Sequence, residues 1–172
     1  MPVFLACGIF LVTNYHSMMI TRVIPMYVAK IDYRWIHIPI AITGNLIGGI
    51  FTAFIISYAR IAGTIKETLT RVVEIKIQDG LLSMLIMSIF CGILVAYSTL
   101  TSRKYKKGSI AQLFYTAFFI VAFVICGFDH VVANGFYFAA QSFINGFDIQ
   151  MLTNIVIVLF GNILRRSICW YH

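Results

Sequence analysis

The hydrophobic residues of this chain form long stretches rather than the short periodic runs of a water-soluble fold. A helix that crosses a bilayer needs about 20 apolar residues, and each stretch approaches or exceeds that length. Short polar segments separate the stretches, as loops separate membrane spans. The pattern predicts an all-α, polytopic membrane helix bundle forming one domain over residues 1–172, with apolar segments at about 2–28, 36–59, 80–100, 110–143 and 151–169.

Two of these stretches carry polar or helix-breaking residues near their centres. The stretch 2–28 is interrupted by Asn14 and Pro25. The stretch 110–143 is too long for one span at a rise of ~1.5 Å per residue, and it contains Asp129. Backbone without helical hydrogen bonds survives at membrane depth only when it packs in protein or lines a cavity. We therefore expect two broken helices, the pattern of binding sites in inverted-repeat transporters.

Two other segments have distinct patterns. Gly44 and Gly48 form a small-xxx-small face, which would let another helix approach closely. The segment 60–79 alternates charged residues with Val and Ile, which predicts an amphipathic helix that links two spans along the membrane interface. Its charges nearly cancel, so it requires no nucleic-acid or anionic-lipid partner.

The composition excludes soluble classes of protein. Hydrophobic residues make up 60% of the chain, charged residues make up 11%, and the mean hydropathy is +0.91. Soluble domains are roughly 25% charged, so this chain lacks the polar residues to cover a water-facing globule. A soluble enzyme and a disordered chain are both excluded.

The net charge of +7 is concentrated in alternate connections between the apolar stretches. Basic residues gather at Lys30–Arg34, at Arg103–Lys107 and at the pair Arg165-Arg166 near the C-terminus. The positive-inside rule places these three segments in the cytoplasm. The sequence therefore predicts a multi-pass protein of the cell membrane with a cytoplasmic C-terminus and no nucleic-acid partner.

Nothing in the sequence indicates a catalytic centre, a cofactor or a metal site. Phosphate-binding glycine loops, HExxH and the nucleophile elbow GxSxG do not occur. The four cysteines lack the close spacing of metal ligands, and we expect all of them to be small buried hydrophobic residues. The chain is predicted not to be an enzyme. The cysteines are Cys7, Cys91, Cys126 and Cys169.

Asp129 and His130 are the strongest candidates for chemistry, because an ionisable side chain at membrane depth needs a cavity or a partner. Histidine has an unperturbed pKa near neutrality, so a desolvated imidazole could stay neutral until a proton or an anion arrives. The alternative is a histidine that forms a hydrogen bond with a neighbouring helix and so stabilises a kink. We expect Asp129 to cap the second half-helix. Asn134, four residues after His130, could contact a solute or bond another helix.

The residues from Cys126 to Asn134 read CGFDHVVAN, which resembles the G-F-[ED]-H-x-[IV]-A-N signature of the formate/nitrite transporter family. GNLIGG at 44–49 and Gly161-Asn162 are similar to that family's two glycine–asparagine motifs. The resemblance implies an aquaporin-like inverted repeat of six helices, broken in the second and the fifth. It also implies a homopentamer in which each protomer has a pore for small monovalent anions such as formate, nitrite, hydrosulfide or lactate.

The resemblance also implies roles for individual residues. His130 corresponds to the family's central histidine, and Thr21 to the threonine in the break of its second helix. Asn134 would lie beside the same pore. Two apolar constrictions would be formed by Leu5 with Phe123 and by Ile9 with Met19.

The chain departs from the family pattern at four places, one of which is the end of the second glycine–asparagine motif, where Arg165-Arg166 stand. It begins about where the family's second helix starts, so we expect the first helix to be missing. Arg22 follows Thr21 where the family has a small residue. Gln112 aligns with a lysine that the family carries near the start of its fifth helix.

These observations lead to one main hypothesis. An anion held near Thr21 accepts a proton or a hydrogen bond near His130 and crosses the apolar constrictions as a neutral weak acid, because desolvating the bare anion is very unfavourable. The partners would be the anion, the bilayer and further copies of the chain. The alternative is a truncated, non-conducting membrane subunit of the same fold. A membrane enzyme would need a cofactor or metal cluster that the sequence lacks.

Overall fold

The computed structural model describes residues 37–106 and 108–164, which form helices joined by short connections. The all-helical architecture is therefore confirmed for these residues, and the break expected within 2–28 lies outside them. In chain order the helices are α3 (His37–Tyr58), α4 (Ile61–Ile77), α5 (Leu81–Lys104), α6 (Ile110–Ile125), α7 (Val131–Asn145) and α8 (Ile149–Leu164).

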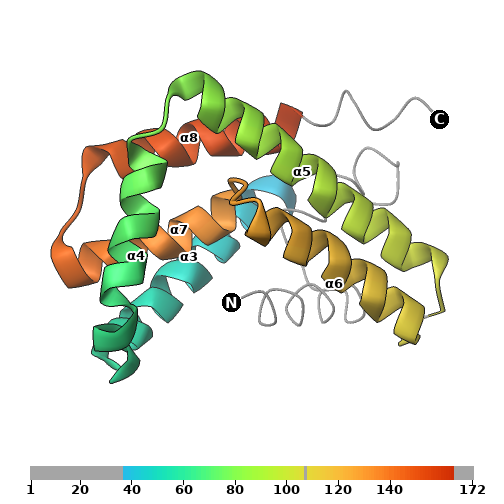
Figure 1. The fold of residues 1–172 in the computed structure, drawn as a ribbon, viewed down its shortest axis with the longest axis horizontal. Coiled ribbons are helices and arrows are strands. Elements are labelled where there is room, and N and C mark those ends of the chain that lie inside the picture. The colour runs from blue at the N-terminus through green and yellow to red at the C-terminus, as the bar shows by residue number, and fades with distance from the viewer. Residues whose placement is uncertain (1–36, 107, 165–172) are drawn as a thin grey trace.

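The helices pack so that segments distant in the sequence lie side by side (Figure 1). α3 packs along α7, and α5 contacts both α6 and α8. α4 crosses one side of the bundle, where it contacts α3, α7 and α8. This arrangement brings the connection between α6 and α7 close to α5 and α8, and it is the connection that holds the candidate residues.

Much of the outer surface of the described bundle is apolar, whereas many polar side chains are buried inside it. Phe51 on α3 is 63% exposed, Phe114 on α6 is 61% exposed and Val156 on α8 is 66% exposed. Lipid or another membrane-embedded protein would cover such surfaces. The buried polar residues are Ser88, Ser98, Gln112, Thr116, Asp129, His130, Asn134, Gln141, Asn154 and Asn162.

One of the described helices is long and apolar enough to cross a membrane. α5 contains an apolar window of 18 residues, Leu81–Ser98, that is long enough to cross a membrane by length and composition. Shorter apolar helical segments occupy Ile42–Tyr58, Ile110–Ile125 and Ile149–Leu164.

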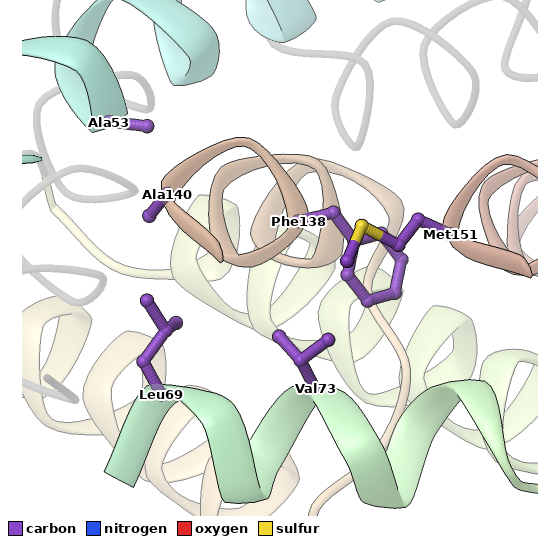
Figure 2. Packing of buried hydrophobic residues seen from close by; sticks show 6 residues of the cluster. All are labelled: Ala53, Leu69, Val73, Phe138, Ala140 and Met151. Carbon is purple, nitrogen blue, oxygen red and sulfur yellow. The ribbon is translucent and has the colours of Figure 1, made fainter. Parts of the chain in front are cut away.

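The amphipathic helix α4 is attached to the bundle through its apolar side. Leu69 and Val73 are buried and point toward α7, as Figure 2 shows. α3 and α8 complete the same cluster. The apolar side of α4 is therefore covered by protein, which fixes the helix against the bundle. The buried members of the cluster are Ala53, Leu69, Val73, Phe138, Ala140 and Met151.

The glycine face expected at Gly44 and Gly48 does not make the close helix contact within the described bundle. Both residues are exposed, and no described atom lies within 4 Å of a Cβ placed on either. α3 is turned so that Gly49 approaches α7 instead, with the added Cβ 3.8 Å from the backbone nitrogen of Phe136. Within the described bundle Gly49 therefore makes the close approach, because packing on α7 sets the rotation of α3, and a contact of Gly44 and Gly48 with another helix stays a prediction.

Two of the four cysteines lie in the described residues, and they differ. Cys91 is buried in a cluster with Val95, Ile120 and Phe123, as expected. Cys126 is exposed, which contradicts the expectation of burial. The reason is its position, because α6 ends just before it and residues 125–127 are all exposed. Cys7 and Cys169 lie outside the described residues.

Gly161 permits the close approach of α8 to α5, and substitution with alanine tests this contact. A Cβ at position 161 would lie 1.8 Å from Ser88 Oγ and 2.8 Å from Ser88 Cβ. We expect Gly161→Ala to destabilise the protein by about 1–3 kcal/mol, because the overpacked helices must separate. Thermal unfolding of the detergent-solubilised protein would measure the loss.

The matched control is Gly44→Ala, which adds the same methyl group where no described atom lies within 4 Å. We expect the unfolding temperature of this variant to be unchanged or slightly raised, since alanine favours helix more than glycine does. Equal unfolding temperatures for Gly161→Ala and the control would contradict the assigned contact.

Candidate functional site

The break predicted within 110–143 lies between the end of α6 at Ile125 and the start of α7 at Val131. Gly127 has φ +70°, a left-handed conformation that glycine adopts without strain. His130 is extended, with φ −113° and ψ 120°, and its Nδ1 accepts a hydrogen bond from the Ala133 N–H at 3.3 Å. The chain therefore leaves one helix, turns at glycine and begins the next helix at a histidine cap.

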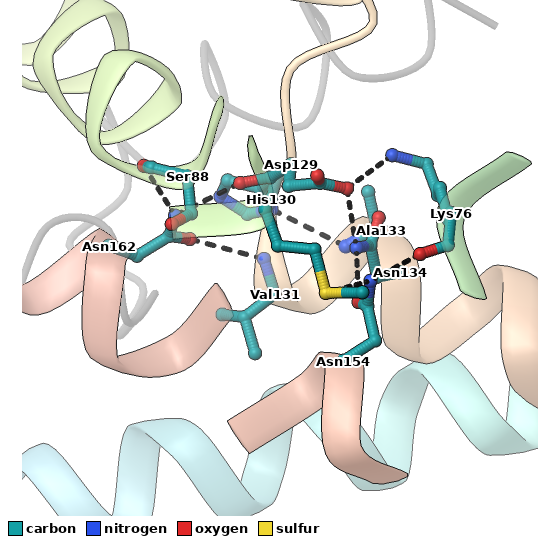
Figure 3. Close-up of polar contacts among 10 residues, drawn as sticks. Lys76, Ser88, Asp129, His130, Val131, Ala133, Asn134, Asn154 and Asn162 are labelled. Carbon is teal, nitrogen blue, oxygen red and sulfur yellow. Dashed lines mark hydrogen bonds and ion pairs between the residues drawn. The ribbon is translucent and has the colours of Figure 1, made fainter. Parts of the chain in front are cut away.

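Asp129 was expected to cap the second half-helix, and this expectation is wrong. Because α7 begins at Val131, the capping position belongs to His130. The carboxylate of Asp129 instead forms an ion pair with Lys76 of α4 and accepts a hydrogen bond from Asn134 Nδ2 at 2.8 Å. Figure 3 shows these contacts on one side of the break.

Lys76 is the residue that sequence analysis missed. The side chains of Lys76 and Asp129 are 12% and 5% exposed, so the pair lies largely inside the protein. A buried carboxylate needs such a compensating charge, because an unpaired ion is strongly disfavoured there. The helical spacing of Leu69, Val73 and Lys76 places the lysine on the same face as the buried residues of α4. That spacing could have identified Lys76.

Asn134 connects the ion pair to α8. Its Nδ2 donates to Asp129 Oδ1 and also to Asn154 Oδ1, the latter at 2.9 Å. Asn154 Nδ2 in turn donates to the backbone carbonyl of Lys76 at 3.0 Å. Of the two roles left open for Asn134, the interhelical hydrogen bond is the one observed here.

Asn162 of α8 holds the backbone of the break in place. Its Oδ1 accepts from the Val131 N–H at 3.1 Å, and its Nδ2 donates to the Asp129 carbonyl at 3.0 Å. The same Nδ2 donates to the Ser88 carbonyl of α5 at 2.8 Å. The two residues of the Gly161-Asn162 motif therefore act together: the glycine brings α8 close to α5, and the asparagine bonds the interrupted backbone.

The structure brings only some of the predicted site residues together. The buried ring of His130 stacks on that of Phe123, with 5.8 Å between ring centroids and 28° between planes. Gln112 is buried at the other end of α6, where its Oε1 accepts from the Gly108 N–H at 2.8 Å. Five of the named residues lie outside the described ranges: Leu5, Ile9, Met19, Thr21 and Arg22.

No other feature of the described residues is as strong a candidate for a functional site as the break. No group of three or more His, Cys, Asp or Glu within the ranges 37–106 and 108–164 could hold a metal ion. An open groove of about 550 Å³ runs along the charged side of α4 and does not include His130. Its lining residues are Gly63, Lys66, Glu67, Thr70, Arg71 and Glu74.

Comparisons with known proteins agree on one family and one fold. The sequence model of the formate/nitrite transporter family matches residues 3–165. Among solved structures, the chain is similar to an FNT family ion channel with a TM-score of 0.81 at 20% sequence identity. The alignment covers 95% of this chain and 70% of that channel. No curated protein matches the sequence.

Proposed function

This chain belongs to the formate/nitrite transporter family, and we propose that it carries small monovalent anions or their weak acids across a membrane. The proposed solutes are of the formate, nitrite and hydrosulfide class. His130 is proposed to link their passage to protons, and Thr21 and the constriction residues Leu5, Ile9 and Met19 are proposed to complete the path with Phe123.

The observation that carries this proposal is a buried imidazole at the start of a half-helix. His130 is 3% exposed and caps α7, where the aligned peptide dipoles of the helix produce a positive potential. The amino end of an interrupted helix at membrane depth favours anionic groups. An anion that reached the break would therefore meet a favourable electrostatic potential and a side chain able to donate a hydrogen bond or a proton.

The ion pair beside the histidine supports the same proposal. Asp129 precedes His130, and an uncompensated carboxylate at that position would repel an incoming anion. Lys76 neutralises this charge, and Asn134 holds the carboxylate by a further hydrogen bond. The break can therefore accept an anion although it contains an aspartate.

The capping bond determines which nitrogen of His130 exchanges protons. Nδ1 accepts the hydrogen bond from the Ala133 N–H, so the hydrogen of the neutral ring is on Nε2. We propose that the ring first takes up a proton from water and that Nε2 of this imidazolium then gives a proton to the solute anion, which leaves a neutral ring beside a neutral acid. Phe123 stacks on the ring and supplies an apolar surface that a charged solute crosses with difficulty but a neutral acid crosses readily.

The placement in the membrane is part of the proposal. The exposed apolar faces of α3, α6 and α8 suit a multi-pass protein of the cell membrane, in which bilayer and neighbouring copies cover them. The basic segments Lys30–Arg34 and Arg103–Lys107 support a cytoplasmic C-terminus. The assembly proposed is a homopentamer.

Flux measurements on the reconstituted full chain test the proposed function. We expect proteoliposomes to show formate, nitrite or hydrosulfide flux above that of protein-free liposomes, with a rate that rises as the pH falls. Sulfate, which is divalent, serves as the control solute and should not be carried. Oligomers that reconstitute correctly but show no flux above the protein-free background would favour the non-conducting subunit instead.

A further inference from the structure

The connection between α5 and α6 carries concentrated positive charge without nearby acidic residues. Residues 103–107 include four basic residues, and the chain has no Asp or Glu from 80 to 128. Lys104 and Lys106 are exposed, and neither forms an ion pair with another described residue. Figure 1 places this connection at the end of α5 and α6 that is far from the break. The charge is therefore available to a partner outside the bundle.

An aromatic surface adjoins these lysines. Tyr105 and Tyr115 stack at 5.1 Å between centroids with 7° between their planes, directly beside the basic connection. Phe114 and Phe118 are 61% and 56% exposed and continue the surface along α6. Tyrosine at the end of a span is typical of the boundary between hydrocarbon and headgroups, and the phenylalanines extend this surface as a purely apolar one. We call this set the aromatic face; its members are Tyr97, Tyr105, Phe114, Tyr115, Phe118 and Phe119.

Hydrogen bonds join the described residues of the connection to one another and to the start of α6. The Gly108 N–H donates to Gln112 Oε1 at 2.8 Å, and the Ser109 N–H donates to the Lys106 carbonyl at 3.0 Å. Ser109 Oγ caps α6 by accepting from the Gln112 N–H at 3.2 Å. Gly108 permits the turn with φ +77°. A preformed turn loses little conformational entropy when a ligand binds to it.

We propose that this connection binds the phosphate headgroup of an anionic phospholipid, with the acyl chains lying on the aromatic face. Lys104 and Lys106 would donate hydrogen bonds to the phosphate oxygens, and the exposed rings of α6 would cover the upper acyl segments. A free phosphate ion would use only the charged part of this surface. The continuity of the charged and apolar parts therefore selects a lipid as the occupant.

Lipid titration of the purified full chain in detergent tests the proposal. We expect dioleoylphosphatidylglycerol to raise the unfolding temperature in a saturable manner and dioleoylphosphatidylcholine to have little effect. Each juxtamembrane lysine contributes roughly fivefold to binding of an anionic surface, so Lys104→Gln/Lys106→Gln should weaken the apparent affinity roughly 25-fold. Lys104→Arg/Lys106→Arg keeps the charge and should keep most of the affinity.

Three results would overturn the proposal. The matched variant Lys66→Gln/Arg71→Gln removes two exposed charges from α4 and should leave the lipid affinity unchanged. An equal loss in this variant would mean that overall charge, not the connection, attracts the lipid. Equal stabilisation by phosphatidylcholine would exclude charge recognition. Equal stabilisation by inorganic phosphate would exclude the aromatic face as part of the site.

Discussion

Replacement of Lys76 with methionine is expected to destabilise the bundle by about 3–5 kcal/mol and to abolish anion flux. Methionine retains much of the volume of lysine but leaves the carboxylate of Asp129 buried without its cation. An uncompensated charge in this position is unfavourable for folding, and it would also repel an anion at His130. Unfolding in denaturant and flux in proteoliposomes measure the two effects separately.

Two further variants identify the ion pair as the cause. Lys66→Met removes an exposed lysine from the same helix and should change the stability little. Lys76→Met/Asp129→Asn removes both charges while keeping an oxygen that can accept from Asn134, so it should recover most of the lost stability. If Lys76→Met is as stable as Lys66→Met, the buried ion pair does not contribute the stability assigned to it.

Replacement of His130 with asparagine is expected to lower proton-linked flux roughly a hundredfold while the protein remains folded. Asparagine is among the best helix N-caps and can replace the bond from the Ala133 N–H, but it cannot exchange a proton near neutral pH. For the wild type at constant total solute, the flux should rise with falling pH more steeply than the concentration of the neutral acid in solution does. For His130→Asn, it should follow that neutral fraction alone.

Comparison with His130→Ala separates the capping role from the proton-exchange role. Alanine removes both the cap and the ring, so it should lower the stability by about 1 kcal/mol relative to asparagine. Both variants should lose the additional pH dependence of flux. A His130→Asn protein with the rate and pH profile of the wild type would mean that the histidine only holds the kink.

The helical class, the second break and the family follow from the sequence because each depends on a local pattern. An apolar stretch of 34 residues around Asp129 cannot be one span, so the interruption observed at 126–130 is already implied by length. The signature around His130 occupies consecutive positions, and the family assignment rests on such runs along the chain. The burial of His130 likewise follows from its position inside an apolar segment.

The contacts of the site depend on how the helices turn against one another, which local patterns do not specify. Asp129 and Lys76 are 53 positions apart, and only the crossing of α4 over α7 brings them into contact. His130 caps α7 because that helix starts at Val131, and the carboxylate of Asp129 is paired with Lys76 instead. Gly49 rather than Gly44 or Gly48 faces α7 because packing sets the rotation of α3 about its axis.

Sequence alone thus determined that the chain is a membrane helix bundle with a break near Asp129 and a buried imidazole beside it, because chain length and hydrophobicity limit which segments can lie in lipid. Tertiary structure alone decided the partners of that imidazole and of its neighbouring carboxylate. A buried charge must be compensated by whichever group the packing brings within reach, and this group came from a helix predicted to be only a linker.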